Sequence, residues 1–307
     1  MRRRDSLRLQ LRHADGEGRG RGVEACTEQP RRAARENPGV TNELRVVLGE
    51  YDTGWHDPVT SLERASALVR RAARHGAHLV ALPEMCLSGF TMEPKAHAVT
   101  LDSPHVRALA GIAAENEVHV LAGVAARELV EGREVFQNTA LLFGPGGELE
   151  ASYRKQKLFA YASEHASYEP GDGPATAMVH GVRIGLFICY DLRFPELFRA
   201  VAPDVDAMFI IANWPSGRRP HWDALLPARA IENQCYVVGV NRIGDAGGLS
   251  YDGGSAAYDP WGERLQPTTL ADQTAGYVVL RAERVAEIRS RYPFIRDLVR
   301  EQSPVGA

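Results

Sequence analysis

The sequence predicts an α/β fold in which two layers of β-sheet are covered by helices on both outer faces. Short, continuous apolar segments recur along the chain, as in strands that are buried on both faces. Several are followed by segments whose apolar residues recur at helical spacing, which indicates βα units. One pair of apolar segments is joined by Gly144-Pro145-Gly146-Gly147, which predicts an antiparallel hairpin. A mixture of βα units and hairpins favours two packed sheets with outer helices.

The first half of the predicted domain alternates strands and helices. An apolar strand over 44–49 precedes a helix, which opens with a capping box at Thr60 and Glu63 and continues at helical spacing. Residues 78–82 form a continuous apolar run that predicts a buried strand. Another helix is expected where Ser103 is followed by a proline. Further strands are expected over 118–125, 139–143 and 149–153.

The second half continues this pattern. A strand over 182–188 is followed by Pro195, which starts a helix. The remaining expected elements are strands over 208–212, 236–241, 255–258 and 274–280, and helices over 222–233 and 284–290. Because no linker and no short internal repeat interrupts this region, we expect one domain over residues 44–300.

Residues 1–43 differ from this domain in composition. The first 40 residues hold ten arginines and six acidic residues and show no sustained apolar period. A secretory signal needs an apolar core of ~7–15 residues, which does not follow the first arginines. We therefore expect a disordered tail, or sequence upstream of the natural start, with an RNA-binding arm as the alternative. Residues 301–307 are expected to form a short C-terminal tail.

The composition argues against several classes of function. The net charge of −3, from 36 basic and 39 acidic residues, argues against a nucleic-acid partner. No apolar run approaches the ~18 residues of a membrane span, so no membrane association is expected. The four cysteines are too widely spaced for a disulfide or zinc pattern, and the histidines show no ligand spacing. We expect a cytoplasmic protein with reduced thiols and without a metal ion.

Cys189 is the candidate nucleophile. It ends the apolar strand over 182–188, and a helix is expected about six residues later at Pro195. Backbone N–H groups and the positive end of a helix would lower the pKa of a thiol at such a turn and favour the thiolate. The alternative is a buried structural cysteine, which is the commoner fate of a free thiol.

Two other residues have candidate roles at strand ends. Glu84 follows the buried strand over 78–82, where a carboxylate beside apolar residues can act as a general base. Lys155 ends the second hairpin strand, and a lysine near a tetrahedral centre can stabilise an oxyanion. Taken singly, an ordinary loop acid and a solvated lysine are the simpler interpretations.

Together these three segments resemble the signature of the nitrilase, or carbon–nitrogen hydrolase, superfamily. The resemblance rests on Leu82-Pro83-Glu84, on Tyr153-Arg154-Lys155 with Leu158-Phe159, and on Cys189-Tyr190-Asp191-Leu192-Arg193-Phe194-Pro195-Glu196. It covers about residues 44–300 and implies a four-layer α-β-β-α sandwich. It also implies that Glu164, which precedes a Pro-Gly pair, is a second glutamate that orients the lysine or the substrate.

Within the superfamily the chain is most similar to bacterial omega-amidases. The residues that carry this similarity are Met85, Ser88-Gly89-Phe90-Thr91-Met92, Asn213-Trp214-Pro215, Ala228-Arg229-Ala230-Ile231-Glu232-Asn233, Gly239-Val240-Asn241-Arg242-Ile243-Gly244, and Tyr292-Pro293-Phe294 with Asp297. Two departures are visible. Lys157 replaces the usual histidine of the lysine motif, and the glutamine and aspartate usual after the first strand are Glu50 and Asp52 here.

The resemblance implies a thiol hydrolase that acts on a small-molecule amide. Cys189 would attack the amide carbon, Glu84 would move the proton, and Lys155 with the backbone N–H of Tyr190 would hold the oxyanion. Ammonia would leave, and water would then hydrolyse the thioester. The expected substrate-binding residues are Tyr190, Arg193, Asn213 and Trp214. The resemblance implies neither a metal nor an organic cofactor. It does imply a homodimer or a higher homo-oligomer.

The choice of substrate stays open at this level. Omega-amidases act on monoamides of short dicarboxylic or 2-oxo acids, whose far carboxylate an arginine would suit. Arg193, Arg218, Arg219 and Arg242 lie near motif positions, and each has the alternative role of a structural ion-pair partner. The other functions to weigh are an aliphatic amidase, a nitrilase, an N-carbamoyl amidase, or a non-catalytic protein on the same fold. The intact triad argues against the last of these.

Overall fold

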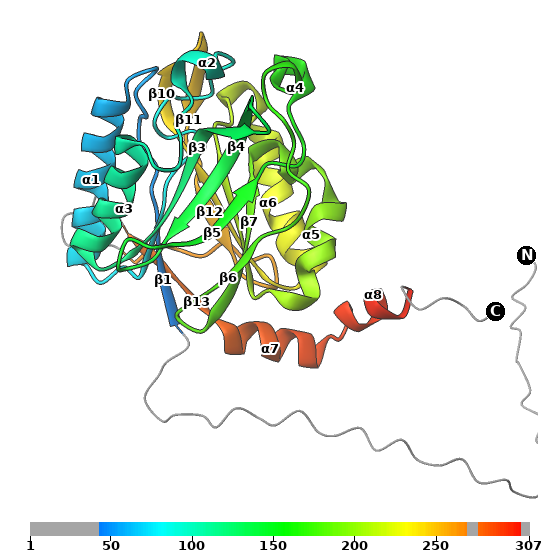
Figure 1. Cartoon of the computed structure of the whole chain (residues 1–307). Helices are drawn as coiled ribbons and strands as arrows, with labels where there is room; N and C mark the ends of the chain where they lie inside the picture. The colour runs from blue at the N-terminus through cyan, green and yellow to red at the C-terminus, as the bar shows by residue number, and fades with distance from the viewer. Residues whose placement is uncertain (1–42, 269–275, 302–307) are drawn as a thin grey trace, which may run out of the picture. The chain divides into compact units, whose positions relative to one another are not determined.

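Two β-sheets lie face to face between helices in the computed structural model (Figure 1), which describes residues 43–268 and 276–301. The strands of the first sheet, in spatial order, are β13 (Tyr277–Arg281), β1 (Glu43–Leu48), β2 (Leu79–Ala81), β3 (His119–Val130), β4 (Arg133–Phe143) and β5 (Leu149–Arg154). Those of the second sheet are β12 (Ala256–Tyr258), β9 (Tyr236–Asn241), β8 (Ala207–Ala212), β7 (Val182–Ile188) and β6 (Thr176–Val179). A separate hairpin joins β10 (Ile243–Ala246) to β11 (Leu249–Asp252).

Helices cover the outer face of each sheet. The first sheet packs on α1 (Pro58–Arg74) and α3 (Pro104–Asn116), and the second on α5 (Pro195–Val201) and α6 (Arg219–Asn233). The other described helices are α2 (Pro94–His97), α4 (Glu164–Ser167), α7 (Ala282–Arg291) and α8 (Ile295–Glu301), with short 3-10 turns η1 (Ala160–Ala162), η2 (Cys189–Arg193), η3 (Ala202–Asp204) and η4 (Ser216–Arg218). None of these helices combines the length and apolar character needed to cross a bilayer. The expected α-β-β-α layering is confirmed.

The alternation of side chains along each strand divides the core into three layers. In β2, Leu79 faces the space between the sheets, whereas Val80 packs towards α1 and α3. In β8, Phe209 faces the same inner layer, whereas Met208 packs towards α5 and α6. Because both faces of these strands are buried, their sequences are continuously apolar. This pattern is what made the inner strands predictable.

Several element bounds differ from those expected. Helix α1 begins at Pro58 rather than at a capping box, because the Asp57 carboxylate accepts a hydrogen bond from the backbone N–H of Thr60 at 3.1 Å. Strands β3 and β4 extend beyond the predicted ranges as a hairpin whose tip is exposed and mixes charged residues with Leu129 and Val130, so its sequence lacks the continuous apolar pattern of a buried strand. The expectations for residues 1–42, 274–275 and 302–307 fall outside the described residues.

The parallel strands fix where the functional side chains meet. Strands β1, β2 and β3 run parallel in the first sheet, as do β7, β8 and β9 in the second. The carboxyl ends of parallel strands form the ligand crevice of α/β sheets. The segments that follow β2, β7 and β8 are therefore the structural frame of a candidate site.

Candidate active site

Four polar side chains that follow strand ends come together across the two sheets. Lys155 and Cys189 come directly after β5 and β7, Asn213 comes directly after β8, and Glu84 follows β2 by three residues. The backbone N–H of Asn213 donates to Glu84 Oε2 at 2.9 Å, although the two residues are 129 positions apart. The predicted Glu84, Lys155 and Cys189 thus lie in one site, assembled by the packing of the two sheets.

A buried cluster of charged side chains lies at the centre of this site. Lys155 Nζ donates to Glu84 Oε1 at 3.0 Å and to Glu164 Oε1 and Oε2 at 3.0 and 2.9 Å. The side chains of all three residues are fully buried. Burial by itself lowers the pKa of Lys155, but the charges of Glu164 and Glu84 outweigh it, so this pKa lies above its ordinary value. The lysine is therefore a fixed cation between two carboxylates.

Asn138 joins the same cluster, and the sequence did not single it out. Its Nδ2 donates to Glu84 Oε1 at 2.7 Å and to Glu164 Oε1 at 2.9 Å. The residue lies in β4, next to Lys155, whose backbone N–H donates to the Asn138 carbonyl oxygen at 2.9 Å. The available signal was the run of three polar residues over 137–139, which stands between apolar residues of β4; all three are buried.

The backbone that carries Glu84 packs tightly against β3. A Cβ added at Gly123 would lie 2.6 Å from Glu84 Cα and 2.8 Å from the backbone nitrogen of Met85. The backbone N–H of Cys86 donates to the Gly123 carbonyl oxygen at 2.8 Å, and the Asn213 Nδ2 donates to the Glu84 carbonyl oxygen at 2.7 Å. Only glycine allows this close approach, which holds Glu84 in place.

Asp191 holds the turn that presents Cys189. Cys189 has a φ of 44°, in the left-handed region that non-glycine residues seldom adopt. The Asp191 carboxylate accepts hydrogen bonds at 2.9 Å from the backbone N–H groups of Ile188 and Lys157 and from the Tyr153 hydroxyl. Burial raises the pKa of Asp191 to about 6, although these hydrogen bonds oppose the shift. Asp191 therefore connects the turn at Cys189 to the end of β5.

The expectation of a lowered pKa for Cys189 is wrong. Its turn continues into the short η2 rather than directly into α5, and burial raises the pKa of the thiol well above its ordinary value. The negative charge of Glu84 raises this pKa further, against the opposing charge of Lys155. The resting residue is a thiol, with Sγ 3.9 Å from the Asn213 carbonyl oxygen. For this residue to act as a nucleophile, a base would have to remove its proton.

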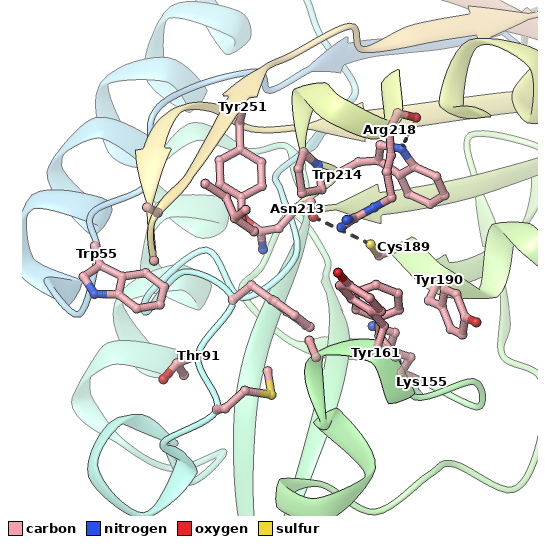
Figure 2. A pocket seen from close by; sticks show the side chains of 18 of the residues that line it. Trp55, Thr91, Lys155, Tyr161, Cys189, Tyr190, Asn213, Trp214, Arg218 and Tyr251 are labelled. Carbon is pink, nitrogen blue, oxygen red and sulfur yellow. Dashed lines mark hydrogen bonds between the residues drawn. The ribbon is translucent and has the colours of Figure 1, made fainter. Parts of the chain in front are cut away.

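A cavity of about 360 Å³ opens beside Cys189 (Figure 2). The predicted substrate-binding residues Tyr190, Arg193, Asn213 and Trp214 all line it, as does Lys155. Glu84 and Glu164 are fully buried and do not line it. The other lining residues, most of them aromatic or apolar, are Trp55, Phe90, Thr91, Met92, Glu93, Phe159, Tyr161, Ala162, Pro215, Arg218, Ala246, Gly247, Leu249 and Tyr251.

The candidate arginines fall into two groups. Arg193 and Arg218 line the cavity, where their guanidinium groups lie 4.8 Å from the Trp214 ring centre and 5.0 Å from the Phe159 ring centre, respectively. The other two arginines do not line it. Arg219 pairs with Asp223 and Asp252, and the buried Arg242 pairs with Asp52.

Lys157 lies outside this cavity. Its Nζ is 3.4 Å from a carboxylate oxygen of Glu196 and 4.9 Å from the ring centre of Phe194. Its side chain is partly exposed, and its backbone N–H donates to the Asp191 carboxylate, which holds the turn at Cys189. The replacement of the usual histidine therefore leaves the charged cluster unchanged. Within the described part of the chain, no group of three His, Cys, Asp or Glu side chains is arranged to hold a metal ion.

Comparisons with known proteins give matches over most of the chain. The carbon-nitrogen hydrolase family model matches residues 48–290. Omega-amidase YafV from Escherichia coli (strain K12) is 34% identical over 255 residues, which cover 83% of this chain and 96% of that protein. The 2-oxoglutaramate amidase of Bacillus subtilis (strain 168) is 30% identical over 255 residues, covering 81% of this chain and 95% of that protein.

A solved structure shows the same similarity in three dimensions. XC1258 from Xanthomonas campestris, a CN-hydrolase superfamily protein crystallised with an arsenic adduct in its active site, has a TM-score of 0.76 and 35% identity. The match covers 83% of this chain and 97% of that chain. The sequence matches and the structural match therefore both cover nearly all of the region that the structure describes.

Proposed function

Because this chain belongs to the carbon-nitrogen hydrolase family, we propose that it hydrolyses a small-molecule amide through a covalent intermediate on Cys189. The observation that carries this proposal is the buried cluster of Glu84, Lys155 and Glu164 beside a cysteine that lines the cavity. A structural role alone would not require two carboxylates and an ammonium to be buried next to a thiol, since each buried charge costs on the order of several kcal/mol.

Acylation begins with the thiol form of Cys189. As Sγ bonds to the amide carbon, the thiol proton passes to the Glu84 carboxylate and the carbonyl π electrons move to oxygen. The carbon–nitrogen bond then breaks, and the leaving nitrogen takes the proton from Glu84. Ammonia and a thioester are the products of this half-reaction. The raised pKa of Cys189 makes the base essential, because little thiolate is present beforehand.

The oxyanion is stabilised by Lys155 and by the backbone N–H of Tyr190. Lys155 is a fixed cation that already lines the cavity, so no reorganisation is needed when negative charge develops. Two of its three contacts go to the two oxygens of Glu164, and one N–H can serve both of them. Another N–H is then available to the oxyanion. Glu164 holds the ammonium in this orientation.

Hydrolysis of the thioester uses the same base. Glu84 removes a proton from water, the water oxygen bonds to the acyl carbon, and the carbon–sulfur bond breaks. Glu84 returns the proton to Sγ, which restores the thiol. The net reaction is amide plus water giving carboxylic acid plus ammonia, with no other reactant.

For the substrate, we propose the monoamide of a short dicarboxylic or 2-oxo acid, which is the substrate class of an omega-amidase. Arg193 and Arg218 bring two guanidinium groups to the same cavity as Cys189, and neither has a carboxylate partner among the described residues. The names of the E. coli and B. subtilis relatives agree with this substrate class. Of the two, Arg218 is the better candidate, since an Arg193 nitrogen lies 3.0 Å from His221 Nδ1.

A substrate panel tests this proposal. We expect kcat/KM for 2-oxoglutaramate to exceed that for a neutral amide of similar length by ~10²-fold or more, because the neutral analogue leaves a desolvated guanidinium unpaired. Arg218→Met should remove most of this preference while sparing the neutral amide. Arg219→Met is the matched control, because this neighbouring arginine pairs with acids outside the cavity. Equal values for anionic and neutral amides, or better turnover of a nitrile or carbamoyl compound, would reject the omega-amidase assignment.

We also propose that the protein forms a homodimer through the outer face of α6. Ile231 on this helix is 56% exposed, Trp261 is 44% exposed and Phe294 is 58% exposed. Ile231 contacts the loop at Gly262, and the ring of Tyr292 lies between those of Trp261 and Phe294, at 4.7 and 6.0 Å. A contiguous apolar patch of this kind is typical of an interface. Light scattering should give twice the chain mass for wild type, and Ile231→Glu should halve it. A monomeric wild type would reject the dimer.

A further inference from the structure

The two buried glutamates, Glu84 and Glu164, accept different numbers of hydrogen bonds. A carboxylate offers about four acceptor sites, two on each oxygen. Glu164 uses all four: Oε1 accepts from Asn138 and Lys155, and Oε2 accepts from Lys155 and from the backbone N–H of Phe159 at 2.6 Å. Glu84 uses three: Oε1 accepts from Asn138 and Lys155, and Oε2 accepts, among the residues that the structure describes, only from the backbone N–H of Asn213. One acceptor site therefore remains, on Glu84 Oε2.

The geometry points to Asn138 as a positioning residue that directs the thiol proton to Glu84 Oε2. Asn138 donates one N–H to Oε1 of each glutamate, so that both Oε1 atoms are occupied and the two carboxylates stay separate acceptors. This inference rests on the proposed function, in which Glu84 is the base for Cys189. It adds which oxygen takes the proton and which residue, outside the Glu84–Lys155–Cys189 triad and Glu164, makes that choice.

The oxygen with the open acceptor site contacts Asn213, which also contacts Cys189. Glu84 Oε2 is bound to the backbone N–H of Asn213, and the carbonyl oxygen of the same Asn213 lies 3.9 Å from Cys189 Sγ. The peptide unit on either side of Asn213 thus connects the acceptor oxygen with the thiol. Oε1, in contrast, lies between Asn138 and Lys155.

An amide suits this position better than any charged group. Two neighbouring carboxylates tend to share a proton, and a base that already holds a proton cannot accept one. The two N–H groups of one amide serve both carboxylates at once without adding charge to the buried cluster. The opposite orientation would point Asn138 Oδ1 at two carboxylate oxygens, so the surroundings fix the amide.

The cost of this arrangement is visible in the structure. Asn138 is fully buried, and its Oδ1 has no hydrogen-bond partner among the described residues. Buried polar atoms are normally paired, and exceptions are often found at functional sites. Asn138 also does not line the cavity, so its contribution must act through the glutamates and not by direct contact with substrate.

The experiment compares Asn138→Leu, which has a similar volume and no donor, with wild type. We expect kcat to fall by ~10-fold to 100-fold, KM to change by less than ~3-fold, and the acid limb of kcat/KM to move up by about one pH unit, because the two carboxylates then share a proton at low pH. Asn138→Ser, which keeps one donor, should be intermediate and covers the case in which Asn138→Leu does not fold.

Asn233→Leu is the matched control. Asn233 is another fully buried asparagine whose Oδ1 has no hydrogen-bond partner in the described part of the chain, but its Nδ2 donates to the Arg229 carbonyl oxygen in α6. Its replacement should lower the melting temperature without moving the pH profile. An unmoved acid limb in both Asn138 variants, or the same movement in Asn233→Leu, would overturn the inference.

A second readout does not depend on the substrate. The rate at which iodoacetamide alkylates Cys189 reports removal of the thiol proton, and its acid limb should move upward in Asn138→Leu as well. Suppose that wild type hydrolyses no amide, but that the acid limb of the alkylation rate moves upward in Asn138→Leu. The proposed function then fails, and the role of Asn138 stands. If wild type hydrolyses an amide, and the acid limbs of kcat/KM and of the alkylation rate both stay in place in Asn138→Leu, the role of Asn138 fails and the proposed function stands.

Discussion

Replacing Lys155 with methionine removes the cation that two buried carboxylates share and keeps the length of the side chain. Lys155 Nζ lies 2.9–3.0 Å from three oxygens of Glu84 and Glu164, and all three side chains are fully buried. Removing one partner of a buried ion pair costs ~3–5 kcal/mol because it leaves an uncompensated charge. Since two carboxylates lose their partner here, we expect a loss of about 5 kcal/mol in the free energy of unfolding at pH 7, at the upper end of that range.

The same change should lower turnover by ~10²-fold to 10³-fold, the usual effect of losing one oxyanion donor. Its effect on stability has a defined pH dependence. The folded-state pKa of Lys155 is raised, so its contribution is fully present below the unfolded pKa of ~10.4 and declines as pH rises above it. The difference in stability between wild type and Lys155→Met should therefore be constant from pH 7 to 9 and shrink above about pH 10.4.

Urea unfolding across this pH range and kcat at pH 7 measure the two effects. The double variant Lys155→Met with Glu164→Gln is the informative companion, because it removes one uncompensated charge as well. It should regain part of the lost stability and none of the lost turnover. The reasoning would be refuted if Lys155→Met were as stable as wild type, or if its turnover lay within about threefold of wild type. Either result would show that the buried lysine can be replaced without the expected loss.

Three further changes have defined outcomes. Cys189→Ala should abolish turnover with a melting temperature near that of wild type, because only one sulfur is lost; substantial activity would exclude Cys189 as the nucleophile. Gly123→Ala should cost ~1–3 kcal/mol and lower kcat by ~10²-fold, because its Cβ would displace Glu84, whereas Gly111→Ala, with open space around it, should change neither kcat nor binding. His78 has a pKa lowered to about 4 by burial and by the charges of His180 and Arg45. Because its unfolded pKa is ~6.5, stability should fall as pH drops from about 6.5 to 4, and His78→Gln should flatten that part of the curve measured by denaturation.

Local sequence patterns predicted the layers because both faces of the inner strands are buried. Alternating residues of β2 and β8 enter different core layers, so these segments are continuously apolar and stand out from the chain. Hairpin tips and short elements such as β6, β10 and β11 were not predicted, because partly exposed strands of four residues carry little apolar signal. The start of α1 differs for a local reason, since Asp57 caps the helix three residues before Thr60, where the predicted capping box begins.

The sequence pointed to individual residues of the candidate site, but not to the contacts between them. Motif spacing identified Glu84, Lys155 and Cys189, each at a strand end. Asn138 was missed because its role arises from the pairing of β4 with β5, which places it beside Lys155 and has no motif of its own. The pKa of Cys189 was predicted in the wrong direction, because the sequence showed a helix start ahead but not how deeply the turn is buried or how close Glu84 lies. Tertiary packing also separated the cavity arginines from those engaged in ion pairs.

If the reaction passes through a thioester, Cys189 carries an acyl group that can be transferred to water or to an added nucleophile. The most direct test is partitioning with hydroxylamine, using an amide and a methyl ester that share one acyl group. A common thioester on Cys189 predicts the same ratio of hydroxamate to acid from both substrates, and loss of both products in Cys189→Ala. A ratio that depends on the leaving group, or hydroxamate formation that survives in Cys189→Ala, would contradict a covalent intermediate at this residue.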